Sequence, residues 1–449
     1  MAQERWSYEE AMRYLNSRTN YEKKTPTYGP VTFNLDRMRR LVSLLGNPQD
    51  HYPTVHITGT KGKGSVAAMV ESCARSAGLT TGLYTSPHLV DLSERIALQG
   101  TPINRDDLAT MLQRVSVAVE HLRGVALPPH PTFFEILTAT AFCYFSEKRA
   151  SLGVIEVGLG GRLDSTNVVK PAVTVLSRIG LDHTQQLGDT IAAIAGEKCG
   201  IIKPGIPVIS AAQEREAAEV IVSVSRERGC GLFVEGKEVH VIDPVWNPHR
   251  FCWTLSVSTP LGQHRGLELP LLGRHQLSNC SLAVAALDVL SRSGILPPGD
   301  EWMREGLKGV RILARLQYVP GRPPMLLDGA HNPVSMQALV DTLGTFLKYR
   351  KLHLVYAMAT DKDVAQCLRI LLPRADYFYP TMSNSPRAMP TDELAALASQ
   401  IKSIPVRGNP DSKAALAVAL ASADPDDLVL ITGSLYLVGD LLGTVQQKR

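Results

Sequence analysis

A glycine-rich string with two lysines, GTKGKGS at residues 59–65, is the strongest chemical signal in the chain. Glycines let backbone N–H groups approach phosphate oxygens, a helix starting there contributes its positive end, and Lys63 adds a point charge for the β- and γ-phosphates. The spacing is not that of a standard Walker A string, because Gly64 stands between Lys63 and Ser65. An ordinary strand-to-helix turn is the alternative. The β-rich run before the string and the helix-forming run after it favour a phosphate site.

A glutamate inside an apolar run is a candidate magnesium ligand. Glu156 lies in the run VIEV at 154–157, and GLGG follows it. An ionised carboxylate in a buried strand is costly unless it is paired or bound to a cation, and Mg²⁺ prefers such hard oxygen ligands. An ion pair with Arg162 or with a neighbouring residue is the alternative, but the glycines indicate close approach by a ligand.

Two more polar side chains follow predicted strands. His183 lies in GLDHT after a strand near 173–176, and Ser86 lies in TSPHL after a short strand at 82–84. Loops after the carboxyl ends of parallel strands are where such sheets bind ligands. Taken alone, each residue has an ordinary explanation, a structural histidine in one case and a plain turn in the other.

Lys198 ends a predicted helix, 190–198, in the string EKCGIIKPG. A cation at a helix C-terminus complements the helix dipole, and residue chemistry alone favours that explanation. The functional alternative is a lysine carbamate formed with carbon dioxide, which would convert the cation into an oxygen ligand beside magnesium.

The elements that must position these residues alternate between strand and helix. Strands are predicted at 53–58, 152–157, 172–176 and 207–210, with helices at 8–15, 35–45, 66–77 and 135–145. Continuous apolar runs separated by helices indicate a mostly parallel sheet covered on both faces. Residues 232–269 change to short Val-, Trp- and Thr-containing runs, which predict a small antiparallel insert, and helical composition returns at 279–293.

A second α/β pattern begins near residue 325. Strands are predicted at 325–328, 352–356 and 428–432, with helices at 334–349 and 392–401. We therefore predict two α/β domains. Residues 1–310 form a P-loop-type N-terminal domain with the insert, and residues 315–449 form a smaller, Rossmann-like C-terminal domain.

Composition excludes several classes of protein. With 44% apolar and 20% charged residues, the 449-residue chain can bury sizeable cores and is not disordered. A net charge of +4 gives no reason to expect nucleic-acid binding. The seven dispersed cysteines contain no CxxC, which predicts reduced thiols in a cytoplasmic protein. The N-terminus resembles no signal or transit peptide, and no apolar run reaches 18 residues, so we expect no membrane span.

Taken together, the strings resemble the folylpolyglutamate synthase/dihydrofolate synthase family of the Mur ligase superfamily. The matching strings occur in the family order: GTKGKGS (59–65), TSPHL (85–89), EVGLGGRLDSTN (156–167), LDHTQQLG (181–188), EKCGIIKPG (197–205), GRHQLSN (273–279), LDGAHNP (327–333) and DKD (361–363). They span nearly the whole chain, and the ordered set is highly specific.

The resemblance implies roles for individual residues. ATP phosphates would be held by Gly62, Lys63, Gly64 and Ser65, with further ATP contacts from Asn279, Arg315 and Asp328. Magnesium ligands would be Ser86, Glu156 and His183, with Lys198 matching the position that is carbamylated in relatives. The pterin-side positions are Leu35, Thr132, Phe134, Leu163, Asp164 and Ser165. Candidates for the incoming glutamate are His331 and Ser434. Catalysis would depend on Lys63, Glu156, His183 and Lys198.

Departures from the family pattern remove none of these groups. Lys61 replaces the usual Asn, Cys199 a usual Ala, Ala314 a common Gly, and the string YAMA at 356–359 a usual Gly-Met-Met. Next to Phe134, we expect Phe133 to pack in the core.

The resemblance implies ATP-dependent addition of L-glutamate to a folate or dihydropteroate carboxylate through an acyl phosphate. ATP and Mg²⁺ are the expected cofactors, and a monovalent cation is a further candidate. The expected partners are these small molecules, and we expect a monomer. One rival is a Mur-type ligase acting on a UDP-muramoyl peptide. A rival of another class is a non-catalytic ATP-binding protein. A dinucleotide dehydrogenase is disfavoured because no GxGxxG with a ribose-binding acid follows the first strand.

Overall fold

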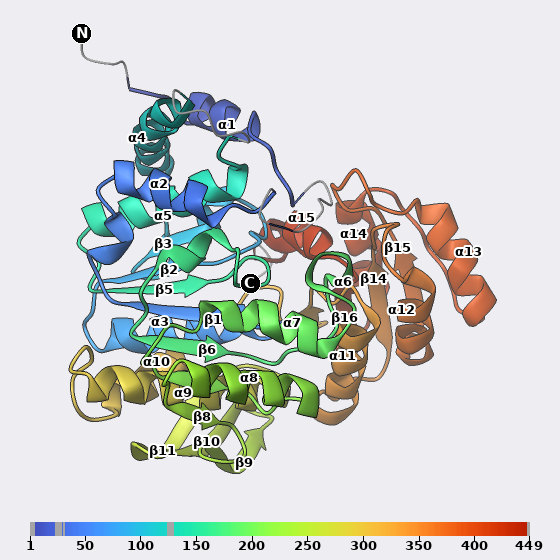
Figure 1. Ribbon diagram of the computed structural model, residues 1–449. Coiled ribbons are helices and arrows are strands. Elements are labelled where there is room, and N and C mark those ends of the chain that lie inside the picture. Colours follow the sequence, from blue (N-terminus) through green and yellow to red (C-terminus); the bar gives the residue numbers. More distant parts are fainter. Residues whose placement is uncertain (1–4, 23–28, 30–31, 124–129, 447–449) are drawn as a thin grey trace.

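The computed structural model describes residues 5–22, 29, 32–123 and 130–446. Two α/β domains, each built on its own sheet, lie side by side (Figure 1). The larger sheet has eight strands in the order β4-β3-β2-β5-β1-β6-β7-β8, and the smaller has five in the order β12-β13-β16-β14-β15. The predicted two-domain α/β fold is confirmed. Among the described residues, no helix is long and apolar enough to cross a membrane.

The centre of the larger sheet is parallel and buried along its whole length. Its strands are β1 (Thr54–Thr58), β2 (Thr81–Tyr84), β3 (Ile96–Leu98), β4 (Thr101–Pro102), β5 (Leu152–Glu156), β6 (Val173–Leu176), β7 (Val208–Ser210) and β8 (Leu232–Val234). Strand β1 pairs in parallel with β5 and β6, with Ile57 opposite Glu156 and Thr58 opposite Leu176. The loops that follow these three strands therefore leave the sheet at one edge.

Helices cover both faces of this sheet (Figure 1). They are α1 (Tyr8–Asn16), α2 (Leu35–Leu44), α3 (Lys63–Ser76), α4 (Arg105–Arg123), α5 (Phe133–Glu147), α6 (Thr184–Leu187), α7 (Ile191–Lys198), α8 (Arg215–Glu227), α9 (His275–Arg292) and α10 (Glu301–Gly309). Four short 3₁₀ helices join them: η1 (Pro48–Asp50), η2 (Leu92–Arg95), η3 (Ser165–Val168) and η4 (Cys199–Ile201). On one face, Val66 and Met69 of α3 pack with β1 and α9, and on the other, Phe142 of α5 packs with α4.

The antiparallel insert is smaller than predicted. It consists of β9 (His240–Asn247), β10 (Cys252–Thr259) and β11 (Gly262–Leu269), in the order β11-β10-β9. The prediction was wrong for β8, which pairs in parallel with β7 as the edge strand of the larger sheet. Helix α8 separates β7 from β8, so this connection is a crossover of the kind that parallel pairing requires.

The C-terminal sheet consists of β12 (Gln317–Val319), β13 (Met325–Leu327), β14 (Leu352–Tyr356), β15 (Tyr377–Pro380) and β16 (Leu428–Thr432). Its helices are α11 (Pro333–Phe346), α12 (Val364–Leu371), η5 (Leu372–Arg374), α13 (Thr391–Ile401), α14 (Ser412–Ser422) and α15 (Leu435–Gln446). The boundary predicted at 310–315 falls between α10 and β12 and stays a prediction.

An aromatic joint connects the insert to the C-terminal domain. It comprises Trp246, Phe251 and Trp253 of the insert with Tyr318 and Phe346 of the C-terminal domain. Phe251 stacks on Tyr318 with ring centroids 4.0 Å apart. Phe346 lies 5.3 Å from both Trp246 and Trp253 in edge-to-face geometry. Such pairs add about 0.5–1.5 kcal/mol each beyond their buried area, so the joint is a firm contact between the domains.

Candidate active site

The glycine-rich string forms the loop between β1 and α3, as predicted. Gly62 is the N-cap of α3 with φ of 95°, and a Cβ there would lie 3.1 Å from the side-chain Cγ of Asn279. Thr60 and Lys61 donate their backbone N–H groups to the Arg178 carbonyl at 2.9 and 3.1 Å. The loop is therefore held at the N-terminus of a 14-residue helix, where backbone N–H groups and the helix dipole favour an anion. Asn279 lies directly against it.

Two lysines converge on this loop. The Lys63 Nζ donates to the Gly59 carbonyl at 3.1 Å, and the Lys198 Nζ donates to the same oxygen at 2.9 Å. Burial lowers the pKa of Lys63, and burial together with the charge of Lys63 lowers the pKa of Lys198 to about 7. Lys198 is the last residue of α7. The helix-dipole explanation is thus incomplete, because its ammonium binds the phosphate loop.

Glu156 faces the phosphate loop from the end of β5. Its Oε2 accepts the Ser86 backbone N–H at 3.3 Å and would lie 3.6 Å from a Cβ added at Gly64. The Glu156 side chain is buried, and this burial raises its pKa. The charge of Lys63 acts in the opposite direction but does not cancel the effect. Arg162 pairs instead with Glu197 at 3.3 Å, so Arg162 is not the partner of Glu156. The buried carboxylate and the adjacent Ser86 fit a magnesium site with few protein ligands.

His183 lies at the start of α6, with φ of 51° and a side chain that is 58% exposed. Desolvation lowers its pKa, Lys63 and Lys198 lower it further, and Asp182 opposes them. The neutral imidazole is the form that binds metals. Asp182 also forms an ion pair with Lys61 at 3.1 Å. Lys61, which replaces the Asn usual in the family, is therefore held beside the site.

Arg315 approaches the site from the C-terminal domain. Its charge lowers the pKa of Glu156 and of Lys63, so the guanidinium lies within electrostatic reach of both. Its neighbours Ala314 and Leu316 have φ of 56° and 46°, a left-handed conformation that explains why glycine suits position 314. The contact of Arg315 with ATP stays a prediction.

The Asp328 carboxylate organises the Arg315 turn. Its Oδ2 accepts the Leu316 N–H at 2.8 Å and its Oδ1 accepts the Ala330 N–H at 2.9 Å. Burial raises its pKa, and these N–H groups counter that effect. Asp328 has a structural role that the sequence did not indicate, and its ATP contact stays a prediction.

The pterin-side residues Phe134 and Asp164 gather around one glycine. The Phe134 ring lies against Gly158, where an added Cβ would be 3.0 Å from its Cε1. Asp164 caps η3, and its carboxylate accepts the Leu159 and Thr166 N–H groups at 2.9 Å each. Phe134 is half-buried, and its ring centroid lies 6.0 Å from that of Tyr84 in a tilted pair. This arrangement offers a flat apolar surface beside hydrogen-bonding groups.

The other pterin-side candidates lie on the surrounding elements. Thr132 is the N-cap of α5 and Leu35 is the first residue of α2. Leu163 is half-buried, and Ser165 is the first residue of η3. Phe133 is buried in the core, which confirms the packing expected for it.

Sequence reasoning missed a buried ion pair between helices α2 and α5. The Arg37 Nη2 lies 2.8 Å from the Glu135 Oε1, and both side chains are buried. The other carboxylate oxygen, Oε2, accepts the Thr132 N–H at 2.7 Å in a capping box. The Thr-Phe-Phe-Glu spacing could have revealed this capping box, whereas nothing local indicated Arg37 as a partner.

The glutamate candidates follow neighbouring strands of the C-terminal sheet. His331 lies after β13 and its Nδ1 is 2.8 Å from the Gly329 carbonyl oxygen. Burial lowers its pKa, and Lys61 and Arg315 contribute. Ser434 follows β16, is buried, and accepts the Tyr436 N–H at 3.1 Å. Because β13 and β16 pair in parallel, both residues leave the sheet at the same edge, but their contact with glutamate stays a prediction.

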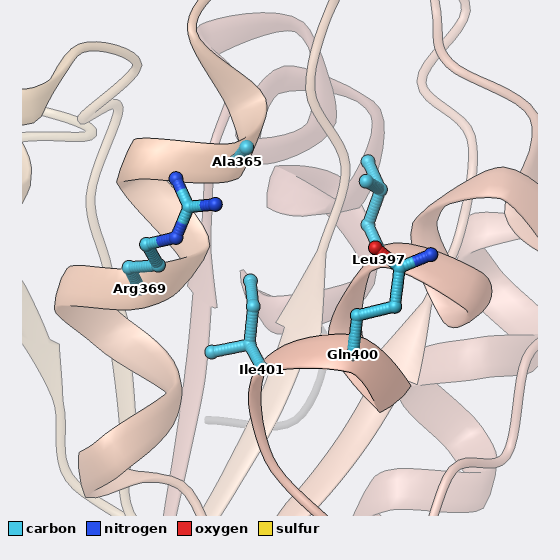
Figure 2. A pocket seen from close by; sticks show the side chains of 5 residues that line it. All are labelled: Ala365, Arg369, Leu397, Gln400 and Ile401. Carbon is cyan, nitrogen blue, oxygen red and sulfur yellow. The ribbon is translucent and has the colours of Figure 1, made fainter.

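A separate cavity of about 390 Å³ lies between α12 and α13 (Figure 2). Its lining residues are Ala365, Arg369, Leu397, Gln400 and Ile401. Figure 1 shows both helices on the side of the C-terminal domain away from the larger domain. The cavity contains none of the candidate site residues.

Comparisons with known proteins first define the class. The Mur ligase middle domain matches residues 57–287, and the Mur ligase glutamate ligase domain matches residues 314–435. A Bacillus subtilis dihydrofolate synthase/folylpolyglutamate synthase is 33% identical over 438 residues, covering 97% of this chain and 98% of that protein.

Solved structures agree with this class. Mycobacterium tuberculosis folylpolyglutamate synthase complexed with ADP has a TM-score of 0.87 and 31% identity, with 98% of each chain covered. Escherichia coli FolC in complex with DHPP and ADP has a TM-score of 0.83 and 28% identity, again with 98% of each chain covered. The chain belongs to the folylpolyglutamate synthase/dihydrofolate synthase family.

Proposed function

We propose that this protein is an ATP-dependent ligase that joins L-glutamate to the carboxylate of a folate or of dihydropteroate. One observation carries the proposal. Lys63 and Lys198 meet at the Gly59 carbonyl while Glu156 faces the same loop, so cations and a hard oxygen ligand surround a helix N-terminus. The relatives named above and the ADP in a relative's structure support it.

The reaction needs activation because a carboxylate is a poor electrophile at neutral pH. The substrate carboxylate oxygen attacks the γ-phosphorus of ATP, the bond to ADP breaks, and an acyl phosphate forms. The α-amine of glutamate then attacks the acyl carbon, phosphate leaves, and the amine loses a proton as the amide forms. Phosphoryl transfer of this kind depends mostly on positioning and on neutralising charge.

The residues of the site divide this work. Lys63 and the N–H groups at the start of α3 bind the phosphates, and Arg315 adds charge from the other domain. Ser86, Glu156 and His183 would hold Mg²⁺, which neutralises phosphate charge when bound. Lys198 would join them as a carbamate. Because ATP would lie between the domains, the C-terminal domain can exclude water from the acyl phosphate.

Phe134 and Asp164 favour a pterin substrate over a UDP-muramoyl peptide. A half-buried ring against Gly158, beside a hydrogen-bonded carboxylate, suits a flat heterocycle with polar edges.

Coupled ADP release by the purified protein tests the proposal. Dihydropteroate and tetrahydrofolate are supplied separately, each with and without glutamate, and a UDP-muramoyl peptide with its amino acid is the comparison. We expect ADP release that requires glutamate and at least one pterin substrate. ADP release only with the UDP-muramoyl peptide would identify the protein as another Mur-type ligase. ATP binding without release under any condition would indicate a non-catalytic protein.

A further inference from the structure

Helix α15 of the C-terminal domain lies against the loop that begins at Ser86 in the N-terminal domain. Leu89 of this loop packs on the apolar cluster that contains Leu437 and Leu441 of α15. At the contact, α15 has a buried glycine, Gly439. A Cβ added there would lie 3.3 Å from the carbonyl carbon of Leu89 and closer still to its oxygen. Helix and loop therefore approach at a distance that only glycine permits.

Hydrogen bonds to Glu94 hold the loop in place at Leu89. The Glu94 carboxylate accepts the backbone N–H groups of Leu89, Val90 and Asp91, each at 2.8 Å. Three residues before Leu89, the Ser86 N–H donates to the Glu156 Oε2. A displacement of Leu89 thus strains its bond to Glu94, and Ser86, which is bonded to Glu156, lies three residues away on the same loop.

The C-terminal domain is fixed on its other side by the aromatic joint. If α15 cannot approach Leu89, the domain can yield by turning about the Phe251–Tyr318 stack. Figure 1 shows α15 on the side of its domain that faces the larger domain. Separation at Gly439 would therefore open the contact between α15 and the loop that begins at Ser86.

We propose that Gly439 is a positioning residue: the absence of a side chain there sets the distance at which the domains meet, and so aligns Ser86 on the nucleotide. The proposal rests on the proposed function for the identity of that nucleotide. Gly439 contacts no substrate in this scheme. It acts through Leu89 on one side and through the position of its own domain on the other.

A matched pair of variants tests this. Gly439→Ala adds one methyl group at the interface. Gly443→Ala adds the same group one turn later on α15, where the residue is exposed and nothing lies within 4 Å of the added atom. Both changes replace a glycine with a better helix former. We expect Gly439→Ala to lower kcat and to weaken Mg²⁺-dependent binding of a non-hydrolysable ATP analogue, measured by calorimetry, by about tenfold each. The KM for the pterin substrate should stay within about twofold.

Gly443→Ala should match the parent protein in both measurements. A folded Gly439→Ala with parental kcat and parental analogue affinity would overturn the proposal. If that variant does not fold, Leu89→Ala replaces it, since it removes the packing on α15 without a clash. We expect the same direction of change in analogue affinity, and unchanged affinity would also overturn the proposal. Because the binding measurement needs no turnover, failure of the ligase assignment is distinguishable from failure of this one.

Discussion

Lys63 and Lys198, 135 positions apart in the sequence, donate to one backbone oxygen, the carbonyl of Gly59. Two ammonium groups on one acceptor repel each other, and each pKa is lowered, first by burial and then, for Lys198, by the charge of Lys63. A bound triphosphate would relieve this repulsion. The arrangement therefore places two amines with lowered pKa values, that of Lys198 about 7, at the point where the phosphates are proposed to bind.

Replacing Lys63 with alanine should abolish most turnover and leave the fold intact. The lysine is half-buried at the first position of α3, where alanine is a good helix former. Loss of one such charge-assisted contact in a phosphate site should lower kcat by about 100-fold or more. Steady-state ADP release and circular dichroism measure the two effects. Normal activity in a folded variant would remove Lys63 from the mechanism.

Lys198→Arg separates the two roles available to Lys198. Arginine keeps a cation near the Gly59 carbonyl but does not form a lysine carbamate. If the carbamate is the active form, Lys198→Arg and Lys198→Ala should both lose activity to a similar degree. Rates of ADP release for the two variants give the comparison. Near-parental activity of the arginine variant alone would assign Lys198 to charge neutralisation.

Glu156→Gln should lose magnesium-dependent nucleotide binding without losing stability. Glutamine keeps an oxygen acceptor for the Ser86 N–H at 3.3 Å. It also removes a buried charge whose pKa is raised by desolvation, so the unfolding temperature should be equal or higher. Calorimetry with an ATP analogue, with and without Mg²⁺, and thermal unfolding measure these effects. A marked fall in unfolding temperature would show that Glu156 is structural.

Local sequence patterns were sufficient for the strand–loop–helix unit around Lys63 and for the position of Glu156 at a strand end. These features depend on neighbouring residues, which a sequence displays directly. The contact of Lys198 with Gly59 spans 139 residues, and the pairing of β8 with β7 depends on the crossover through α8. Neither relationship leaves a local sequence pattern. The sequence alone therefore favoured an interaction of Lys198 with the helix dipole, and it placed β8 in the antiparallel insert.

The Arg37–Glu135 pair is a third relationship that local sequence patterns did not reveal, and it predicts a large effect on stability. Glu135→Ala would leave the Arg37 guanidinium buried without its partner carboxylate, since the pair is 2.8 Å apart with both side chains buried. Breaking such a pair costs about 3–5 kcal/mol. The double variant Arg37→Met/Glu135→Leu should recover much of that loss because no uncompensated charge remains. Urea unfolding of the single and double variants measures it. A single variant as stable as the parent would contradict the prediction.

His264 predicts a pH dependence of stability remote from the site. Burial disfavours its imidazolium, but Asp288, at 2.8 Å, and Asp300 outweigh this effect and raise its pKa above 6.5. A raised folded-state pKa means that the stabilisation is complete below the unfolded value of about 6.5 and is lost as the pH rises through the folded value. His264→Gln should therefore lower the unfolding temperature more at about pH 5.5 than at about pH 9. His249→Gln, an exposed change in the same insert, is the control and should show no such difference. An equal effect of His264→Gln at both pH values would mean that the histidine is not charged in the folded protein.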